Sequence, residues 1–160
     1  MARDKNEAII QYLLQCQQIQ NSPLYFNFVN AKDNTNQILT TAEDSIFGET
    51  YVDGSTLRRY TFTIVTFQSI TENAVVKDGQ HPNENVEDLQ SFQSLIDWIA
   101  EQSNKHNYPD FGDGYIIDDV STTTAMPRLD GVNTEVTPQL AMYSVDIVID
   151  YLDITNTVWL

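Results

Sequence analysis

Positively charged side chains are scarce in this chain. Its 160 residues hold eight Lys and Arg against 23 Asp and Glu, which gives a net charge of −15 at pH 7. Proteins that clamp a phosphate backbone need Lys and Arg to replace its counterions. Proteins that bind membrane surfaces through a polybasic segment need the same residues. The charge balance therefore argues against both classes.

Cysteine and long apolar runs are also nearly missing. Cys16 is the single cysteine, so the chain has no internal disulfide and nothing calls for an oxidising compartment. No run approaches the roughly 18–20 apolar residues of a transmembrane helix. The first residues include acids and precede no long apolar stretch, which argues against a signal peptide. We expect a soluble, acidic protein with no membrane partner.

The composition is nevertheless that of a folded chain. Hydrophobic residues make up 41% and aromatic residues 11% of the sequence, enough to form a core. No repeat or change of composition marks a boundary, and the length suits one domain. We therefore expect a single domain over residues 1–160.

Two segments have helical periodicity. Residues 4–20 place Ile9, Leu13 and Cys16 on one stripe, which Ile10 and Leu14 widen. Residues 85–104 form a second apolar face, with Leu95 and Trp98 at its margin. The positions that define this second face are Val86, Leu89, Phe92, Ile96 and Ile99.

The remaining apolar segments are typical of strands. We expect strands at residues 24–30, 58–70, 115–123 and 140–151, and a short one at 37–41. Turn or loop residues fill 31–36 and 71–82, and Asp53-Gly54 indicates a tight turn. The last strand alternates: Ser144, Asp146 and Asp150 lie on one face, and the other face carries Ala141, Tyr143, Val145, Ile147, Ile149 and Tyr151. This alternation predicts an α+β fold, a mainly antiparallel mixed sheet packed by two helices.

Few residues point to chemistry. Cys16 lies on an apolar helix stripe, where a small buried side chain is expected. His81 and His106 are flanked by turn residues, and no zinc, phosphate-loop or nucleophile-elbow motif is present. The acids between Asp110 and Asp119 do not have calcium-loop spacing. Asp146 and Asp150 suit a solvated face better than an acid–base pair. We therefore predict no catalytic residues, no cofactor and no metal.

Arg58 and Arg59 are the only two adjacent Lys or Arg residues in the sequence. They have two interpretations, which the sequence leaves open. In one, each arginine pairs with one of the many acids of its own chain. In the other, the pair contacts a second subunit, because arginine is enriched at interfaces and binds carboxylates bidentately.

Two stretches carry a resemblance to a known family. The run Tyr51-Val52-Asp53-Gly54-Ser55-Thr56 leads into Arg58-Arg59-Tyr60-Thr61-Phe62, and Asp97-Trp98-Ile99 is followed by Tyr108-Pro109-Asp110-Phe111. These residues, and the order of helices and strands, resemble the tail terminator (tail-completion, "minor capsid") proteins of long-tailed phages and prophages of Gram-positive bacteria. The similarity extends from the first helix to about Tyr151.

The resemblance implies a structural role without catalysis. Members of that family form a ring, typically a hexamer, at the head-proximal end of the tail tube. The ring ends tube growth and joins the tail to the head connector or stopper protein, so the location would be the virion after assembly in the host cytoplasm. The implied fold, a mixed sheet packed by helices, agrees with the fold expected from the residues.

A ring of this kind closes through contacts between different patches of neighbouring subunits. On that basis the candidate interface segments are a hairpin at residues 51–59, the loop at 71–83 and the tail at 153–160. The tail is apolar at its end, so we expect it to dock on its own core or on a neighbour. DNA passes through such a ring, and a negative lumen would repel its phosphates. The predicted interface residues are Tyr51, Asp53, Arg58, Arg59, Val158, Trp159 and Leu160. The predicted lumen acids are Asp118, Asp119, Asp146 and Asp150.

Three other functions stay open at this point. One is a different head–tail neck or completion protein, such as a stopper or an adaptor. Another is a small metal-dependent enzyme that uses the acids from Asp110 to Asp119. The last is an acidic mimic of DNA, although the acids are spread along the whole chain rather than concentrated in one segment. Plain solubility also accounts for the net charge.

Overall fold

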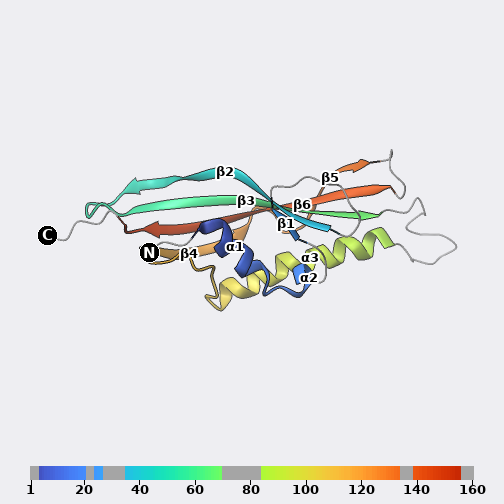
Figure 1. Ribbon diagram of the computed structural model, residues 1–160, viewed down its shortest axis with the longest axis horizontal. Coiled ribbons are helices and arrows are strands. Elements are labelled where there is room, and N and C mark those ends of the chain that lie inside the picture. Colours follow the sequence, from blue (N-terminus) through green and yellow to red (C-terminus); the bar gives the residue numbers. More distant parts are fainter. Residues whose placement is uncertain (1–3, 21–23, 27–34, 70–83, 134–138, 156–160) are drawn as a thin grey trace.

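One long, twisted sheet runs through the molecule, with helices packed along one side (Figure 1). The computed structural model describes residues 4–20, 24–26, 35–69, 84–133 and 139–155. Its helices are α1 (Lys5–Leu13), α2 (Gln17–Gln20) and α3 (Glu84–Asn104). Its strands are β1 (Leu24–Phe26), β2 (Thr35–Thr50), β3 (Thr56–Ser69), β4 (Tyr115–Thr122), β5 (Arg128–Asn133) and β6 (Leu140–Asp153).

The sheet is mainly antiparallel, as predicted. Its strand order is β1-β2-β3-β6-β4, and β5 pairs with β6 beyond the end of β4. Only β1 and β2 are parallel. Strands β3 and β6 are paired without interruption from Thr56 opposite Asp153 to Ser69 opposite Leu140. The predicted α+β class is therefore confirmed.

The helices cover the apolar face of this sheet. In α3, Phe92, Leu95, Ile96 and Ile99 are buried, and in α1 Ile9 and Leu13 are buried. The strand residues beneath them are also buried, and each such side chain contributes roughly 1.5–3 kcal/mol relative to an exposed position. These strand residues are Tyr60, Phe62, Ile64, Val145, Ile147, Ile149 and Tyr151.

The N-terminal helix is broken, where the periodicity predicts one helix. The amides of Gln15 and Cys16 donate to the carbonyls of Tyr12 and Leu13, three residues back, at 3.2 and 2.9 Å. Such bonds tighten a helix end. Cys16 stays fully buried, but Leu14 is 39% exposed and does not widen the apolar stripe. The predicted stripe is therefore wrong at Leu14.

Strand β2 is much longer than the predicted segment 37–41. It extends through Glu43 and Asp44, residues with low strand propensity, because β3 offers a continuous partner. The pairing of β2 with β3 is irregular, with two register shifts, one after Thr40 and one after Ile46. Strand β5 was not predicted at all, and a further register shift lies between its Leu129 and Gly131. Within the predicted strand 24–30, β1 covers Leu24–Phe26, while 27–30 and the predicted loop 71–82 lie outside the described residues.

Candidate functional site

The turn between β2 and β3 contains the first half of the family-like signature. Gly54 has a positive φ of 91°, and its amide donates to the Tyr51 carbonyl at 2.9 Å. The Asp53 carboxylate accepts hydrogen bonds from the Ser55 amide at 2.9 Å and the Ser55 hydroxyl at 2.6 Å. These bonds hold the pKa of Asp53 below its ordinary value. Asp53 therefore has a structural role inside the turn.

The tip of this hairpin presents apolar side chains to solvent. Val52 is fully exposed and Tyr51 is about half exposed, at 52%. In Figure 1 the hairpin extends beyond the layer of helices at one end of the sheet. An exposed tip of this kind offers a contact surface that the isolated chain leaves uncovered.

Arg58 and Arg59 leave β3 on opposite faces, because successive strand residues alternate. Arg58 lies opposite the buried Tyr151, on the face that carries the helices. Its Nε is 3.3 Å from the carboxylate of Asp153, at the end of β6. Burial would raise the pKa of Asp153, but hydrogen bonds from Thr155 and the charge of Arg58 outweigh burial and lower it.

Arg59 binds Asp150 bidentately on the other face. Its Nε donates to one carboxylate oxygen at 2.8 Å and its Nη2 to the other at 3.3 Å. Both arginines therefore have acids of their own chain as partners, which is the first of the two interpretations offered by the sequence. A contact of either arginine with a second subunit stays a prediction.

The N-terminus of α1 is attached to the sheet near the base of the β2–β3 hairpin. The Lys5 ammonium donates to the Tyr151 hydroxyl at 2.8 Å. It also lies 5.1 Å from the ring centre of Tyr115 and 4.9 Å from that of Tyr151. A cation held over aromatic rings is favourable, so Lys5 fixes α1 to β4 and β6.

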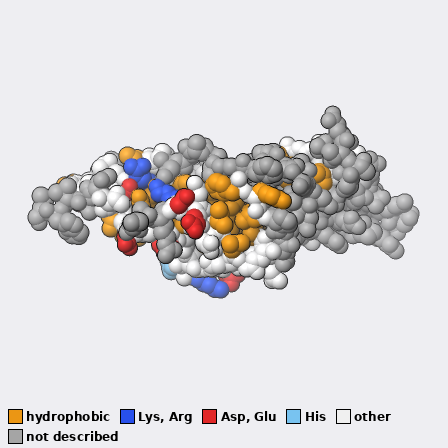
Figure 2. Space-filling view, in the orientation of Figure 1, with side chains coloured by type: hydrophobic (Ala, Val, Ile, Leu, Met, Phe, Trp, Pro, Cys, Tyr) orange, Lys and Arg blue, Asp and Glu red, His pale blue; other side chains and the backbone are white. Residues whose placement is uncertain are grey.

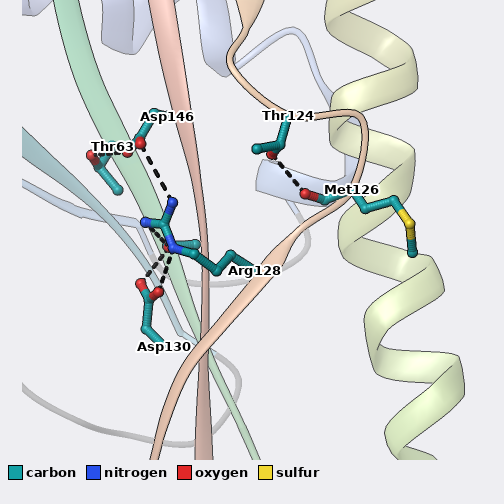
Figure 3. Close-up of polar contacts among 7 residues, drawn as sticks. Thr63, Thr124, Met126, Arg128, Asp130 and Asp146 are labelled. Atoms are coloured by element: carbon teal, nitrogen blue, oxygen red, sulfur yellow. Dashed lines mark hydrogen bonds and ion pairs between the residues drawn. The ribbon is translucent and has the colours of Figure 1, made fainter.

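Asp146 and Asp150 lie on the face of β6 opposite the helices, as the alternation predicts. They are four residues apart, about 13 Å at the rise of a strand, which is too far for a carboxylate pair acting on one bond. Asp146 accepts from Thr63 Oγ1 at 2.6 Å and lies 3.5 Å from Arg128 Nη1 (Figure 3). Each acid therefore has an arginine counterion.

Asp118 and Asp119 are exposed on β4. Because of a register shift between Ile117 and Asp119, it is Asp119 that lies opposite Asp150 on β6. Asp119 and Asp150 are thus cross-strand neighbours, and the row continues to Arg59 on β3. Three of the four predicted lumen acids therefore gather near one row of the sheet, with Asp146 further along β6.

A cluster that the sequence did not reveal joins β5 to β6. Arg128 Nε donates to Asp130 at 2.6 Å, and its Nη2 donates to Ser144 Oγ at 2.8 Å. The Ser144 hydroxyl in turn donates to Asp130. Burial would raise the pKa of Asp130, but its bonds to Arg128 and Ser144 lower it. Ser144 is fully buried, and this triangle satisfies its hydroxyl.

A metal-dependent enzyme would need several ligands close to one point. No group of three or more His, Cys, Asp or Glu there is close enough to hold a metal ion. Asp110 accepts from the Gly112 amide at 2.9 Å, and His106 Nδ1 lies 3.2 Å from the Tyr108 hydroxyl. No described helix is long and apolar enough to cross a lipid bilayer.

A cavity of about 350 Å³ lies beside α1. One wall consists of α1 residues, including Ala8 and Tyr12, and the other of Tyr108, Pro109 and Asp110.

On the face of the molecule shown in Figure 2, hydrophobic side chains gather near the middle, with acidic and basic groups between them and the hairpin end. The predicted interface residues Val158, Trp159 and Leu160 lie outside the described residues.

No protein-family model matches the sequence, and no curated protein matches it significantly.

Proposed function

We propose that this chain is the tail terminator of a long-tailed phage, a structural protein that forms a ring on the head-proximal end of the tail tube. The observation that carries the proposal is the location of the signature Tyr51–Phe62. This segment forms a hydrogen-bonded turn with an exposed apolar tip and then enters the central strand β3. A resemblance concentrated in a projecting hairpin is what a contact with other subunits would require.

The element order supports the same assignment. A leading helix, a hairpin with a long strand, a Trp98-bearing helix and a long last strand follow each other along the chain. This is the order on which the resemblance rests, and the sheet packed by helices is the fold it implies.

In this proposal the hairpin contacts a neighbouring subunit or the tube protein. Closed rings use a heterologous contact, in which one patch meets a different patch. Tyr51 and Val52 supply an apolar patch at the tip. A predominantly hexameric ring would bind the tube protein on one side and the connector or stopper protein on the other.

The lumen is proposed to be lined by the sheet face opposite the helices. Asp118 and Asp119 are exposed on β4, at the edge of the sheet. Asp146 and Asp150 instead have arginine partners that offset their charge. Repulsion of passing DNA would therefore depend mostly on Asp118 and Asp119. If all four acids lie outside the bore of an assembled ring, this part of the proposal fails.

The test is the native mass of the purified protein, measured by light scattering or native mass spectrometry with and without purified tail tubes. The proposal expects a hexamer, or a monomer that forms a ring as concentration rises or when tubes are added. A protein that binds the portal or adaptor ring but never caps tubes would instead be a stopper or adaptor-like neck protein. A strict monomer that binds neither would overturn both assignments.

Val52→Asp tests the hairpin within that assay. A charge at the tip should abolish ring formation or tube capping while leaving thermal unfolding unchanged, because Val52 makes no buried contact. Ala100→Asp, on the exposed side of α3, is the matched control and should assemble like the parent chain. Normal assembly of Val52→Asp would remove the hairpin tip from the interface.

A further inference from the structure

Strand β5 (Arg128–Asn133) is an edge of the sheet. It pairs with β6 on one side, and no described strand pairs with it on the other. Figure 1 shows it at the end of the molecule opposite the β2–β3 hairpin. Two of its side chains are apolar and about half exposed, Leu129 at 55% and Val132 at 47%. A free edge with exposed apolar side chains is a template for pairing with another strand.

Both apolar side chains lie on the helix-covered face of the sheet. Leu129 is paired with Tyr143 and Val132 with Ala141, and both of these β6 residues are buried on that face. Directly paired residues of an antiparallel ladder share a face. The register shift between Leu129 and Gly131 makes this possible, because a regular strand would place residues three positions apart on opposite faces.

The other four residues of β5 lie on the outer face. Arg128 is paired with Ser144, an outward residue of β6, and both donate hydrogen bonds to Asp130. Gly131 and Asn133 are also paired with outward residues of β6. The faces along β5 are therefore outer, inner, outer, outer, inner, outer, a pattern that is the same in both directions.

We propose that β5 pairs with β5 of a second copy of this chain, antiparallel and about a twofold axis between Asp130 and Gly131. A pattern that is the same in both directions lets two copies align with matching faces. Leu129 of each copy then lies opposite Val132 of the other, and the two pairs bury apolar surface that the single chain exposes. Asp130 lies opposite Gly131, so no charged side chain directly faces one of the same sign.

The neighbouring registers do not fit. A shift by one residue in one direction would place the two Asp130 side chains directly opposite each other, where like charges destabilise a pair. A shift in the other direction would place the outward Asp130 opposite the inward Val132. In the proposed register each Asp130 keeps Arg128 of its own chain as a counterion, at 2.6 Å. The self-complementary pattern is what identifies a second copy, rather than an unrelated strand, as the partner.

The contact is small and adds to the proposed ring without resting on it. A ring closes through heterologous contacts, whereas a twofold contact uses the same patch on both copies. Six residues per copy bury less than the roughly 800 Å² per partner of a standard interface, and each chain carries a charge of −15. We therefore expect a weak dimer that salt strengthens.

The first test uses substitutions at Gly131, because a side chain added there meets nothing within 4 Å. Gly131→Asp adds a carboxylate opposite each Asp130 and should weaken the dimer about two- to thirtyfold, whereas Gly131→Lys should strengthen it about two- to tenfold. Gly131→Asn is the uncharged control of the same shape as Asp. Sedimentation equilibrium in about 0.5 M salt measures the dissociation constants. Equal constants for the Asp and Lys variants, or a parent chain that stays monomeric at all concentrations, would overturn the proposal.

The second test checks the register by disulfide cross-linking. A mixture of Leu129→Cys and Val132→Cys chains, oxidised with copper-phenanthroline, should form a disulfide between the two chains, since directly paired residues have Cβ atoms about 5 Å apart. The native Cys16 is buried. A mixture of Leu129→Cys with Met126→Cys, which is also exposed, is the control and should cross-link much less. Equal cross-linking of the two mixtures would contradict the pairing.

Adding Val52→Asp to both chains should leave the cross-link between positions 129 and 132 unchanged. Loss of the ring with this cross-link retained would therefore count against the hairpin contact alone, and a ring that forms without the cross-link would count against the β5 contact alone.

Discussion

At the scale of single residues, several aspartates organise the chain locally. Asp4, Asp53, Asp110 and Asp153 each accept a hydrogen bond from the backbone amide two residues later, at 2.9 Å in every case. Aspartate is well suited to this turn because its short side chain reaches that amide. Part of the strong acidity is therefore a consequence of turn and cap chemistry, independent of any ligand or lumen.

This chemistry makes stability depend on acid pH. The folded pKa of Asp153 lies below its ordinary value of 3.8, so its carboxylate stabilises the fold above that pH. The contribution disappears as the pH falls through the lower folded pKa. We expect the melting temperature of the parent chain to fall below about pH 4, and that of Asp153→Asn to start lower and fall less. Calorimetry between pH 7 and pH 2 measures this, and parallel profiles would contradict it.

At the scale of elements, β6 connects the sheet. It pairs with β3 along one edge and with β4 and then β5 along the other, and its alternate residues form the core floor. Its outward side chains bind arginines of two neighbouring strands, Arg59 on β3 and Arg128 on β5. The outer face is thus a ladder of cross-strand ion pairs and hydrogen bonds.

The Arg59–Asp150 pair should have a small but measurable coupling. Both side chains are partly exposed, so solvent screens the pair, although its geometry is bidentate. A double-mutant cycle with Arg59→Gln and Asp150→Asn should give about 0.2–1 kcal/mol, as exposed ion pairs do. Chemical denaturation supplies the four free energies of unfolding. A coupling near zero would mean that Arg59 is available for contacts with a second subunit.

Two glycines provide a matched pair of backbone tests. Gly114, before β4, has a φ of +89°, and an added Cβ would lie 2.6 Å from Thr155 Cγ2. Gly131 in β5 has open space around it, with nothing within 4 Å. We expect Gly114→Ala to cost at least about 1 kcal/mol and Gly131→Ala to be neutral or slightly stabilising. Denaturant unfolding of both variants measures this, and equal effects would contradict the interpretation.

At the scale of the whole molecule, net charge opposes any self-association. Each chain carries −15, so copies brought into a ring repel one another. In the proposed ring, subunit contacts would have to offset this repulsion, and the exposed apolar side chains of Tyr51 and Val52 are suited to that.

Salt should accordingly favour assembly. Raising the ionic strength from about 0.05 to 0.5 M shortens the screening length to a few ångströms, so the fraction of oligomer at a fixed protein concentration should increase. Analytical ultracentrifugation at the two salt concentrations tests this. Dissociation by salt would instead indicate ion pairs across the interface.

Much of the architecture could be predicted because its signals are periodic and local. The apolar face of α3, the alternation along β6 and the turn at Asp53-Gly54 each arise from neighbours in the sequence. The structure confirms the turn, the alternation and the α3 face from Phe92 to Ile99, whereas the side chains of Val86 and Leu89 lie outside the described residues. Long-range pairing was harder to predict. Glu43 and Asp44 have poor strand propensity, yet they lie in β2 because β3 supplies hydrogen-bond partners for their backbone.

The amino-acid pattern was enough to predict the fold class, the covered face of the sheet and the deficit of basic residues. Which acid meets which arginine became clear from the packed strands alone, because Arg59 and Asp150 are 91 residues apart and meet through strand register. The same holds for the cavity beside α1, where residues near Tyr12 meet a segment almost a hundred positions later. Local patterns determine which side of an element is apolar, whereas contacts between distant side chains depend on how the elements pack.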